Sequence, residues 1–211
     1  MFQWFLSGGP VMWPILLTSI VSFAIIIERF LFIMREKKKR QPAVIEKIFT
    51  CVKAEQFDEA IKEAQHCEDF LAKILLYGLN QRDKSFSNAI VRAANQVLKR
   101  FNQGLPILDM IITLAPLLGL LGTVTGMIYA FGLLGQHALE APVVITGGIA
   151  QALIATACGL GIAIMALIPS VYFNSVVEET RHEIEDVSTR FELLFMKSNS
   201  EKAHENFLSG V

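Results

Sequence analysis

Charge is what this sequence has least of. Only 18% of its 211 residues are charged, whereas soluble domains average about 25%, and 53% are hydrophobic. Residues 1–27 contain no charged side chain, and residues 141–177 contain none either, histidine included. Such long uncharged runs exclude an ordinary soluble domain and indicate membrane residence, with lipid as a neighbour. The formal net charge of −1 gives no reason to expect nucleic acid as a partner.

Cysteine and clustered catalytic groups are also scarce. The three cysteines, Cys51, Cys67 and Cys158, are widely spaced, which argues against a disulfide framework and a cysteine-based metal site. The sequence contains no histidine cluster, no paired carboxylate in an apolar run, no phosphate-binding glycine loop and no nucleophile elbow. We therefore expect no enzyme activity, no metal and no cofactor.

Three apolar runs are long enough to span a bilayer, which takes about 20 residues of helix. They cover about 11–34, 105–134 and 143–173, and Asp109 is the only charged residue in the second. The first run is too long for a secretory signal and has no basic residue before Arg29, so we expect it to be retained. Since no strand pattern is visible, the sequence predicts an all-α integral membrane protein. Its three transmembrane helices should carry long cytoplasmic helical extensions.

Basic residues predict the orientation of these spans. They follow the first span, precede the second and follow the third: Arg35, Lys37, Lys38, Lys39, Arg40, Lys99, Arg100, Arg181 and Arg190. The leader and residues 135–142 contain none. By the positive-inside rule, 35–104 and 174–211 are cytoplasmic, while the start of the chain and the 135–142 loop lie outside. The expected domains are 1–34, 35–104, 105–134, 135–142, 143–173 and 174–211.

Helical patterns fill the predicted cytoplasmic segments. Apolar residues recur at helical spacing in 57–64 (Phe57, Ala60, Ile61 and Ala64). Ser85 or Ser87 is expected to cap a helix from Asn88 that continues through Gly104 and Pro106 into the second span. The third span is expected to continue past Pro169 as an amphipathic helix whose apolar face consists of Val177, Ile184, Val187, Phe191 and Leu194.

Small residues recur every three or four positions in the second and third spans. They are Gly119, Gly122 and Gly126 in the second, and Gly148, Ala152, Ala155, Gly159, Ala163 and Ala166 in the third. Such stripes let helix backbones approach closely. We assign them to helix packing, both within one subunit and between subunits.

Helix packing does not by itself explain four polar residues in these spans: Thr123, Thr125, Gln151 and Thr156. Within hydrocarbon their polar groups need a partner, which can be their own helix, a neighbouring helix or water in a cavity. For a single threonine, a bond back to its own helix is as good an interpretation as a functional role. On ideal helices Thr123 and Thr125 lie on nearly opposite sides, and Gln151 and Thr156 are about 140° apart. Spacing alone therefore does not define a channel.

Two segments resemble a known family. APLLGLLGTVTG (115–126) and GIAQALIATA (148–157) are similar to motifs of the MotA/TolQ/ExbB proton-channel proteins of bacterial inner membranes. The three-span layout resembles the ExbB and TolQ branch rather than the four-span flagellar stators, and the resemblance covers essentially the whole chain. It implies a homopentamer whose second and third spans surround a pore. Helices of an ExbD- or TolR-like partner, carrying an alternately protonated and ionised Asp, would lie inside.

The resemblance also implies roles for individual residues. Thr123 and Thr156 are expected to line the pore facing the partner's Asp, with Gln151 nearby. The proton motive force would then drive mechanical work in envelope transport through a TonB- or TolA-like protein, with the N-terminus periplasmic. Many family members have Glu at the position of Gln151, and Gln cannot exchange a proton. Sodium coupling is therefore an open alternative, and so is a non-conducting scaffold that recruits proteins through 35–104.

Overall fold

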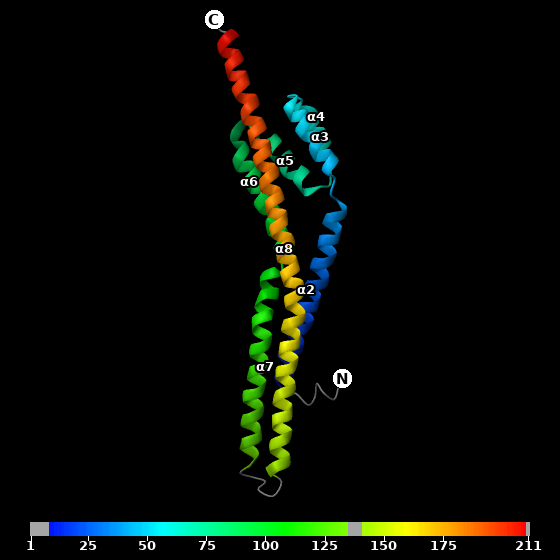
Figure 1. Cartoon of the computed structure of the whole chain (residues 1–211), viewed down its shortest axis with the longest axis vertical. Coiled ribbons are helices and arrows are strands. Elements are labelled where there is room, and N and C mark those ends of the chain that lie inside the picture. The colour runs from blue at the N-terminus through cyan, green and yellow to red at the C-terminus, as the bar shows by residue number, and fades with distance from the viewer. Residues whose placement is uncertain (1–8, 135–140, 210–211) are drawn as a thin grey trace. The chain divides into compact units, whose positions relative to one another are not determined.

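The computed structural model describes residues 9–134 and 141–209, of which 82–86, 133–134, 141–145 and 196–209 are described as backbone only. Our expectations for residues 1–8 of the leader and for residues 135–140 of the 135–142 loop lie outside the described residues. Every regular element in these ranges is a helix, which confirms the predicted fold class (Figure 1). The helices are α2 (Met12–Lys38), α3 (Pro42–Lys53), α4 (Phe57–Gln65), α5 (Phe70–Asn80), α6 (Arg82–Phe101), α7 (Leu105–Leu134) and α8 (Ala141–Ser209).

Three helical stretches of the described chain are long and apolar enough to cross a membrane. They lie within Met12–Lys38, Ser87–Gly132 and Thr146–Phe195, in agreement with the three predicted spans. The protein is therefore a multi-pass membrane protein. Which end of each span faces the cytoplasm stays a prediction from the basic residues.

The chain divides into two compact units. Residues 1–30 and 104–174 form the first, which we call the apolar unit, and residues 31–103 and 175–211 form the second, the polar unit. In the apolar unit α7 and the first half of α8 run side by side (Figure 1). The start of α2 packs on this pair, where Val11, Met12 and Ile15 are buried against Ala155 of α8.

The junction between α6 and α7 differs from our expectation of one continuous helix. α6 begins at Arg82 after Gln81, which makes no side-chain cap, so neither Ser85 nor Ser87 starts it. The helix ends at Phe101, and Gly104 has φ +82°, a left-handed conformation that glycine adopts without steric cost. Pro106 then lies in the first turn of α7, where a missing N–H is tolerated. Gly104 and Pro106 therefore end one helix and begin another.

The predicted continuation of the third span is confirmed, because α8 is one helix from Ala141 to Ser209 with Pro169 inside it. Its later part also has the expected apolar face. Val177, Ile184 and Phe191 are buried there, and Val187 and Leu194 are half-buried. In the same unit, Ala60 and Ala64 of α4 are fully buried, as their spacing predicts.

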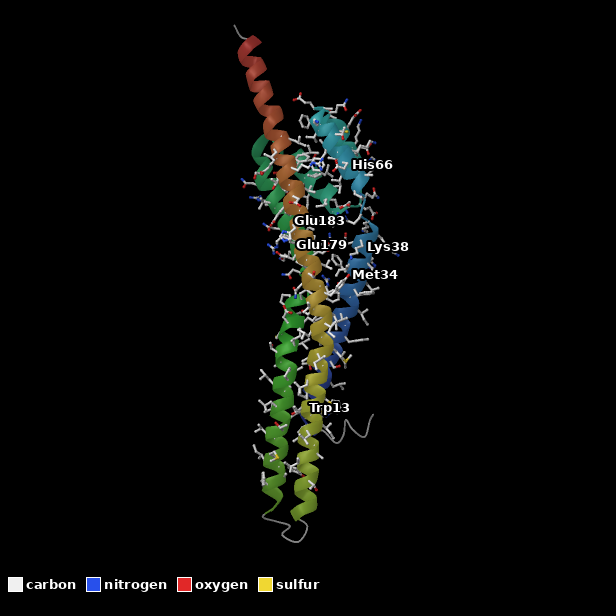
Figure 2. The ribbon with its side chains drawn as sticks, in the orientation of Figure 1. Trp13, Met34, Lys38, His66, Glu179 and Glu183 are labelled. Carbon is white, nitrogen blue, oxygen red and sulfur yellow. The ribbon has the colours of Figure 1, made fainter. Side chains whose placement is uncertain are left out.

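A buried acid and an arginine link separate segments of the polar unit. Asp69 is fully buried, caps α5 by accepting from the amide of Leu71 at 3.0 Å, and also accepts from the amide of Gln41 at 2.9 Å. Arg40 reaches Asp69 at 3.4 Å and Glu183 of α8 at 2.5 Å. Glu183 follows Glu179 by about one turn along α8 (Figure 2). A single arginine thus joins two acids from different helices of this unit.

Candidate functional site

The close approach of α7 and α8 is made by residues without large side chains. A Cβ on Gly122 would lie 2.5 Å from the Cβ of Ala155, and one on Gly159 would lie 2.5 Å from the carbonyl oxygen of Ala115. Real Cβ atoms essentially never approach other atoms within 3.0 Å. At these positions the two backbones are therefore too close for any residue but glycine.

The same contact continues between these two positions and beyond Gly122 toward the end of α7. A Cβ on Gly119 would lie 3.0 Å from the Cα of Thr156, and one on Gly126 would lie 3.1 Å from the Cβ of Ala152. A Cβ on Gly148 would overlap Ala130. The small residues of the two stripes thus face one another within one chain, whereas their role between subunits stays a prediction.

Thr156 makes a hydrogen bond across this interface. Its Oγ1 donates to the carbonyl oxygen of Gly119 on α7 at 3.0 Å, and its side chain is half-buried. The approach is possible because Gly119 carries no side chain. The hydroxyl hydrogen is used in this bond, so the oxygen presents its lone pairs as acceptors.

Thr123 and Thr125 are bonded to their own helix instead. Oγ1 of Thr123 donates to the carbonyl of Leu120 at 2.6 Å, and Oγ1 of Thr125 donates to that of Leu121 at 2.9 Å. Thr123 borders a shallow groove of about 570 Å³ whose other lining residues are Val124, Met127, Ile128 and Phe131. Its hydroxyl is the polar group of an otherwise apolar surface.

Gln151 borders a different groove, of about 420 Å³. The lining residues are Pro10, Gly122, Thr125, Gly126, Tyr129 and Gln151. The amide of Gln151 packs on Gly9, where a Cβ would overlap its Nε2. The structure therefore brings Gln151 and Thr125 to one groove and places Thr123 on the other. Thr156 borders α7 and is linked to it by the hydrogen bond to Gly119.

One polar group of the apolar unit was missed by sequence reasoning. Ser170 of α8 is 2% exposed, and its Oγ donates to Oδ1 of Asp109 on α7 at 2.7 Å. Nδ2 of Asn174 donates in turn to Ser170 Oγ at 3.3 Å. Asp109 was visible as the only charge in its span. Its partners depend on how α7 and α8 align, which a single sequence does not reveal.

The fold and this helix pair define a multi-pass membrane protein. The polar groups that its membrane helices bring to the grooves and the helix interface include threonine hydroxyls and one amide. In the described part of the chain no three His, Cys, Asp or Glu residues cluster as metal ligands. Residues 56–186 match the MotA/TolQ/ExbB proton channel family, and the chain belongs to that family. It is a transport protein and not an enzyme.

Similar proteins carry ExbB names. The chain is 35% identical over 199 residues to an ExbB-like biopolymer transport protein of Synechocystis sp., which covers 90% of this chain and 77% of that relative. It is 27% identical over 191 residues to the biopolymer transport protein ExbB of Neisseria meningitidis, covering 81% and 85%. An ExbB homolog of Methanothermobacter thermautotrophicus is 28% identical over 186 residues, covering 87% and 66%.

Proposed function

We propose that this protein is an ExbB/TolQ-like channel and motor subunit that converts the proton motive force into mechanical work for envelope transport. The observation that carries the proposal is the hydroxyl of Thr156, set between α7 and α8 where packing requires only small residues. An ExbD- or TolR-like single-span protein with a membrane Asp would supply the acid, and a TonB- or TolA-like protein would transmit the work.

The hydrogen bonds of the two threonines suit this role. Thr123 and Thr156 each donate their only hydroxyl hydrogen to a backbone carbonyl, so each offers lone pairs. An acceptor oxygen stabilises a protonated carboxyl group by receiving its hydrogen, and it also stabilises a bare cation. Gln151 adds an amide with two donors, which suits the ionised form of the same carboxyl group. Because Thr123 and Gln151 border different grooves of one chain, the contacts for both states of a partner's Asp would come from more than one subunit.

The energies involved are comparable in size. An ionised carboxylate in mid-membrane costs about 2.5–3.5 kcal/mol on insertion scales. A membrane potential supplies about 2.3 kcal/mol per charge per 100 mV. A few hydrogen bonds from polar groups such as these lower the cost enough for the potential to drive the cycle.

The surfaces of the single chain support a lipid-embedded oligomer. Large apolar side chains on the membrane helices are exposed, among them Trp13, Ile128, Met165 and Ile168. Lipid, partner helices and neighbouring subunits would cover them. We propose a homopentamer in the bacterial inner membrane with a periplasmic N-terminus, a periplasmic 135–142 loop and a cytoplasmic C-terminus, and Trp13 at the outer interface.

The test is a reconstitution of the full chain with the ExbD- or TolR-like protein of its own organism in liposomes. A potassium diffusion potential drives ions inward while an enclosed dye reports pH. We expect acidification only when both proteins are present, and none with Thr156→Val although the complex still forms. A complex that passes no ion would favour the scaffold alternative. Flux of sodium alone, reported by a sodium dye, would favour the sodium-coupled alternative.

A further inference from the structure

Asp109 differs from the other charged side chains in the described part of the apolar unit, because its hydrogen-bond partner is a neutral hydroxyl. Those others are Glu28 and Arg29, which pair with each other at 2.5 Å. Asp109 is exposed on the single chain, yet its carboxylate is held by a side chain of the neighbouring helix. An ionisable residue within a membrane span is costly and marks a functional site more often than a packing position.

The hydrogen bonds around Asp109 form a short directed chain. Asn174 donates to Ser170, and Ser170 donates to Asp109. A serine hydroxyl is able to donate to a carboxylate and to accept from a carboxylic acid after rotating about its C–O bond. Ser170 is therefore able to bond both the ionised and the protonated form of Asp109.

The position of this group relates it to the two threonines. Asp109 precedes Thr123 by 14 residues, and Thr156 precedes Ser170 by 14 residues, as the numbering shows. On a regular helix that separation is about 21 Å along the axis and only about 40° around it. On each helix, then, the acid or its partner lies near the same face as the threonine and about four turns away. The same pair of helices therefore carries polar groups at two levels. Thr123 and Thr156 form the threonine level, and Asp109 with Ser170 lies about four turns away.

We propose that Asp109, positioned by Ser170 and Asn174, is a second proton station on this chain, between the threonine level and the cytoplasmic water. This inference rests on the proposed function and adds an acid that the protein itself supplies. The step is a proton transfer alone. The carboxylate takes the proton that the partner's acid releases past the threonine level, delivered by a hydronium ion, becomes a neutral acid, and releases the same proton to water on the cytoplasmic side.

In the competing interpretation, the hydrogen bond between Asp109 and Ser170 is only a structural tie between α7 and α8. Two variants distinguish this tie from a proton station. Asp109→Asn keeps the size and an acceptor oxygen but loses the acid, whereas Asp109→Glu keeps the acid and changes the length. A tie would tolerate Asn at least as well as Glu. A proton station requires the reverse order.

The experiment measures proton flux in the same liposomes, with complex formation checked for each variant. We expect Asp109→Asn to lower the flux by about a hundredfold, the lower end of what a positioned proton-transfer group contributes. Asp109→Glu should restore most of it, and Ser170→Ala should cause a smaller loss. Asp58→Asn, the same change at an exposed acid of α4, is the matched control and should leave the flux unchanged.

The outcomes separate this inference from the function beneath it. A wild-type complex without flux would overturn both the proposed channel function and the second proton station. Flux that Thr156→Val abolishes but Asp109→Asn leaves intact would overturn the second station alone. Equal losses in Asp109→Asn and Asp109→Glu would also overturn it, because they indicate a structural tie.

Discussion

Oγ1 of Thr156 lies 3.0 Å from the carbonyl oxygen of Gly119, a hydrogen bond between residues 37 positions apart on two antiparallel helices. The bond depends on the missing side chain of Gly119, since a Cβ there would lie 3.0 Å from the Cα of Thr156. The small-residue stripe and the polar residue, which sequence reasoning separated into packing and function, therefore act at one contact. Substitutions at this contact need to distinguish the two effects.

Thr156→Val removes the hydroxyl and keeps the branched shape. We expect the loss of one interhelical hydrogen bond, worth about 0.6–1.7 kcal/mol within a membrane, which is too little to dissociate the oligomer. Ion-driven transport should nevertheless stop, because the acceptor oxygen is gone. Thr156→Ser, which keeps that oxygen, should retain transport. Transport measured beside native gel electrophoresis checks both points, and normal transport in the Val variant would refute the assigned role.

Gly159→Ala tests the packing of α7 on α8. Its new Cβ would meet the carbonyl oxygen of Ala115 at 2.5 Å, a backbone atom that moves only with its helix. We expect a destabilisation of about 1–3 kcal/mol, typical of overpacking, seen as earlier thermal unfolding of the purified protein in detergent. Gly161→Ala is the matched control. A Cβ at Gly161 meets nothing within 4 Å, so that variant should unfold like the wild type or slightly later.

Long-range uncharged runs made the helical class and the three spans predictable, because a bilayer imposes length and composition on any spanning helix. The apolar face of the tail was predictable for a similar reason, since Phe191 and its neighbours repeat at helical spacing. The α6–α7 junction was predicted wrongly. Gly104 followed by Pro106 has the spacing of a helix stop and a helix start, whereas we expected one helix to run through both residues.

The pairings within the site could not be predicted. Ser170 with Asp109 and Thr156 with Gly119 are 61 and 37 positions apart, and each depends on how two helices align along their length. Periodicity indicates which face of a helix is apolar, but it does not determine how far one helix is shifted along its axis relative to another. The threonines illustrate the same limit, because the sequence left open which would bond to its own helix.

Asp69→Ala tests the buried acid of the polar unit. The variant loses the cap of α5 and the hydrogen bond to the amide of Gln41, and it leaves Arg40 with Glu183. We expect a loss of about 2–4 kcal/mol in local stability. Cys67 reports it, since this thiol is 4% exposed and lies 3.6 Å from Oε1 of Gln41. Its labelling by a maleimide should accelerate at least about tenfold, the factor that 1.4 kcal/mol represents.

The conservative variant Asp69→Asn provides the control for that experiment. Asn keeps an oxygen that caps the helix, so Cys67 should be labelled at a rate between those of the wild type and the Ala variant. Equal, slow labelling in all three proteins would show that Asp69 contributes nothing to the closure of this region.

Acid should loosen α3 from α8 through one ion pair. Arg190 donates two hydrogen bonds to Glu46, at 2.6 and 3.0 Å, and these hold the pKa of Glu46 below its ordinary value of 4.5. Because the folded-state pKa is lowered, the stabilisation is present above pH 4.5 and is lost as the pH falls through the lowered value. Hydrogen exchange of the α3 amides, compared between wild type and Glu46→Gln, measures this. The wild type should be better protected at neutral pH, and the difference should vanish in acid. Asp58→Asn should behave as wild type throughout, and a difference that persists unchanged in acid would contradict the prediction.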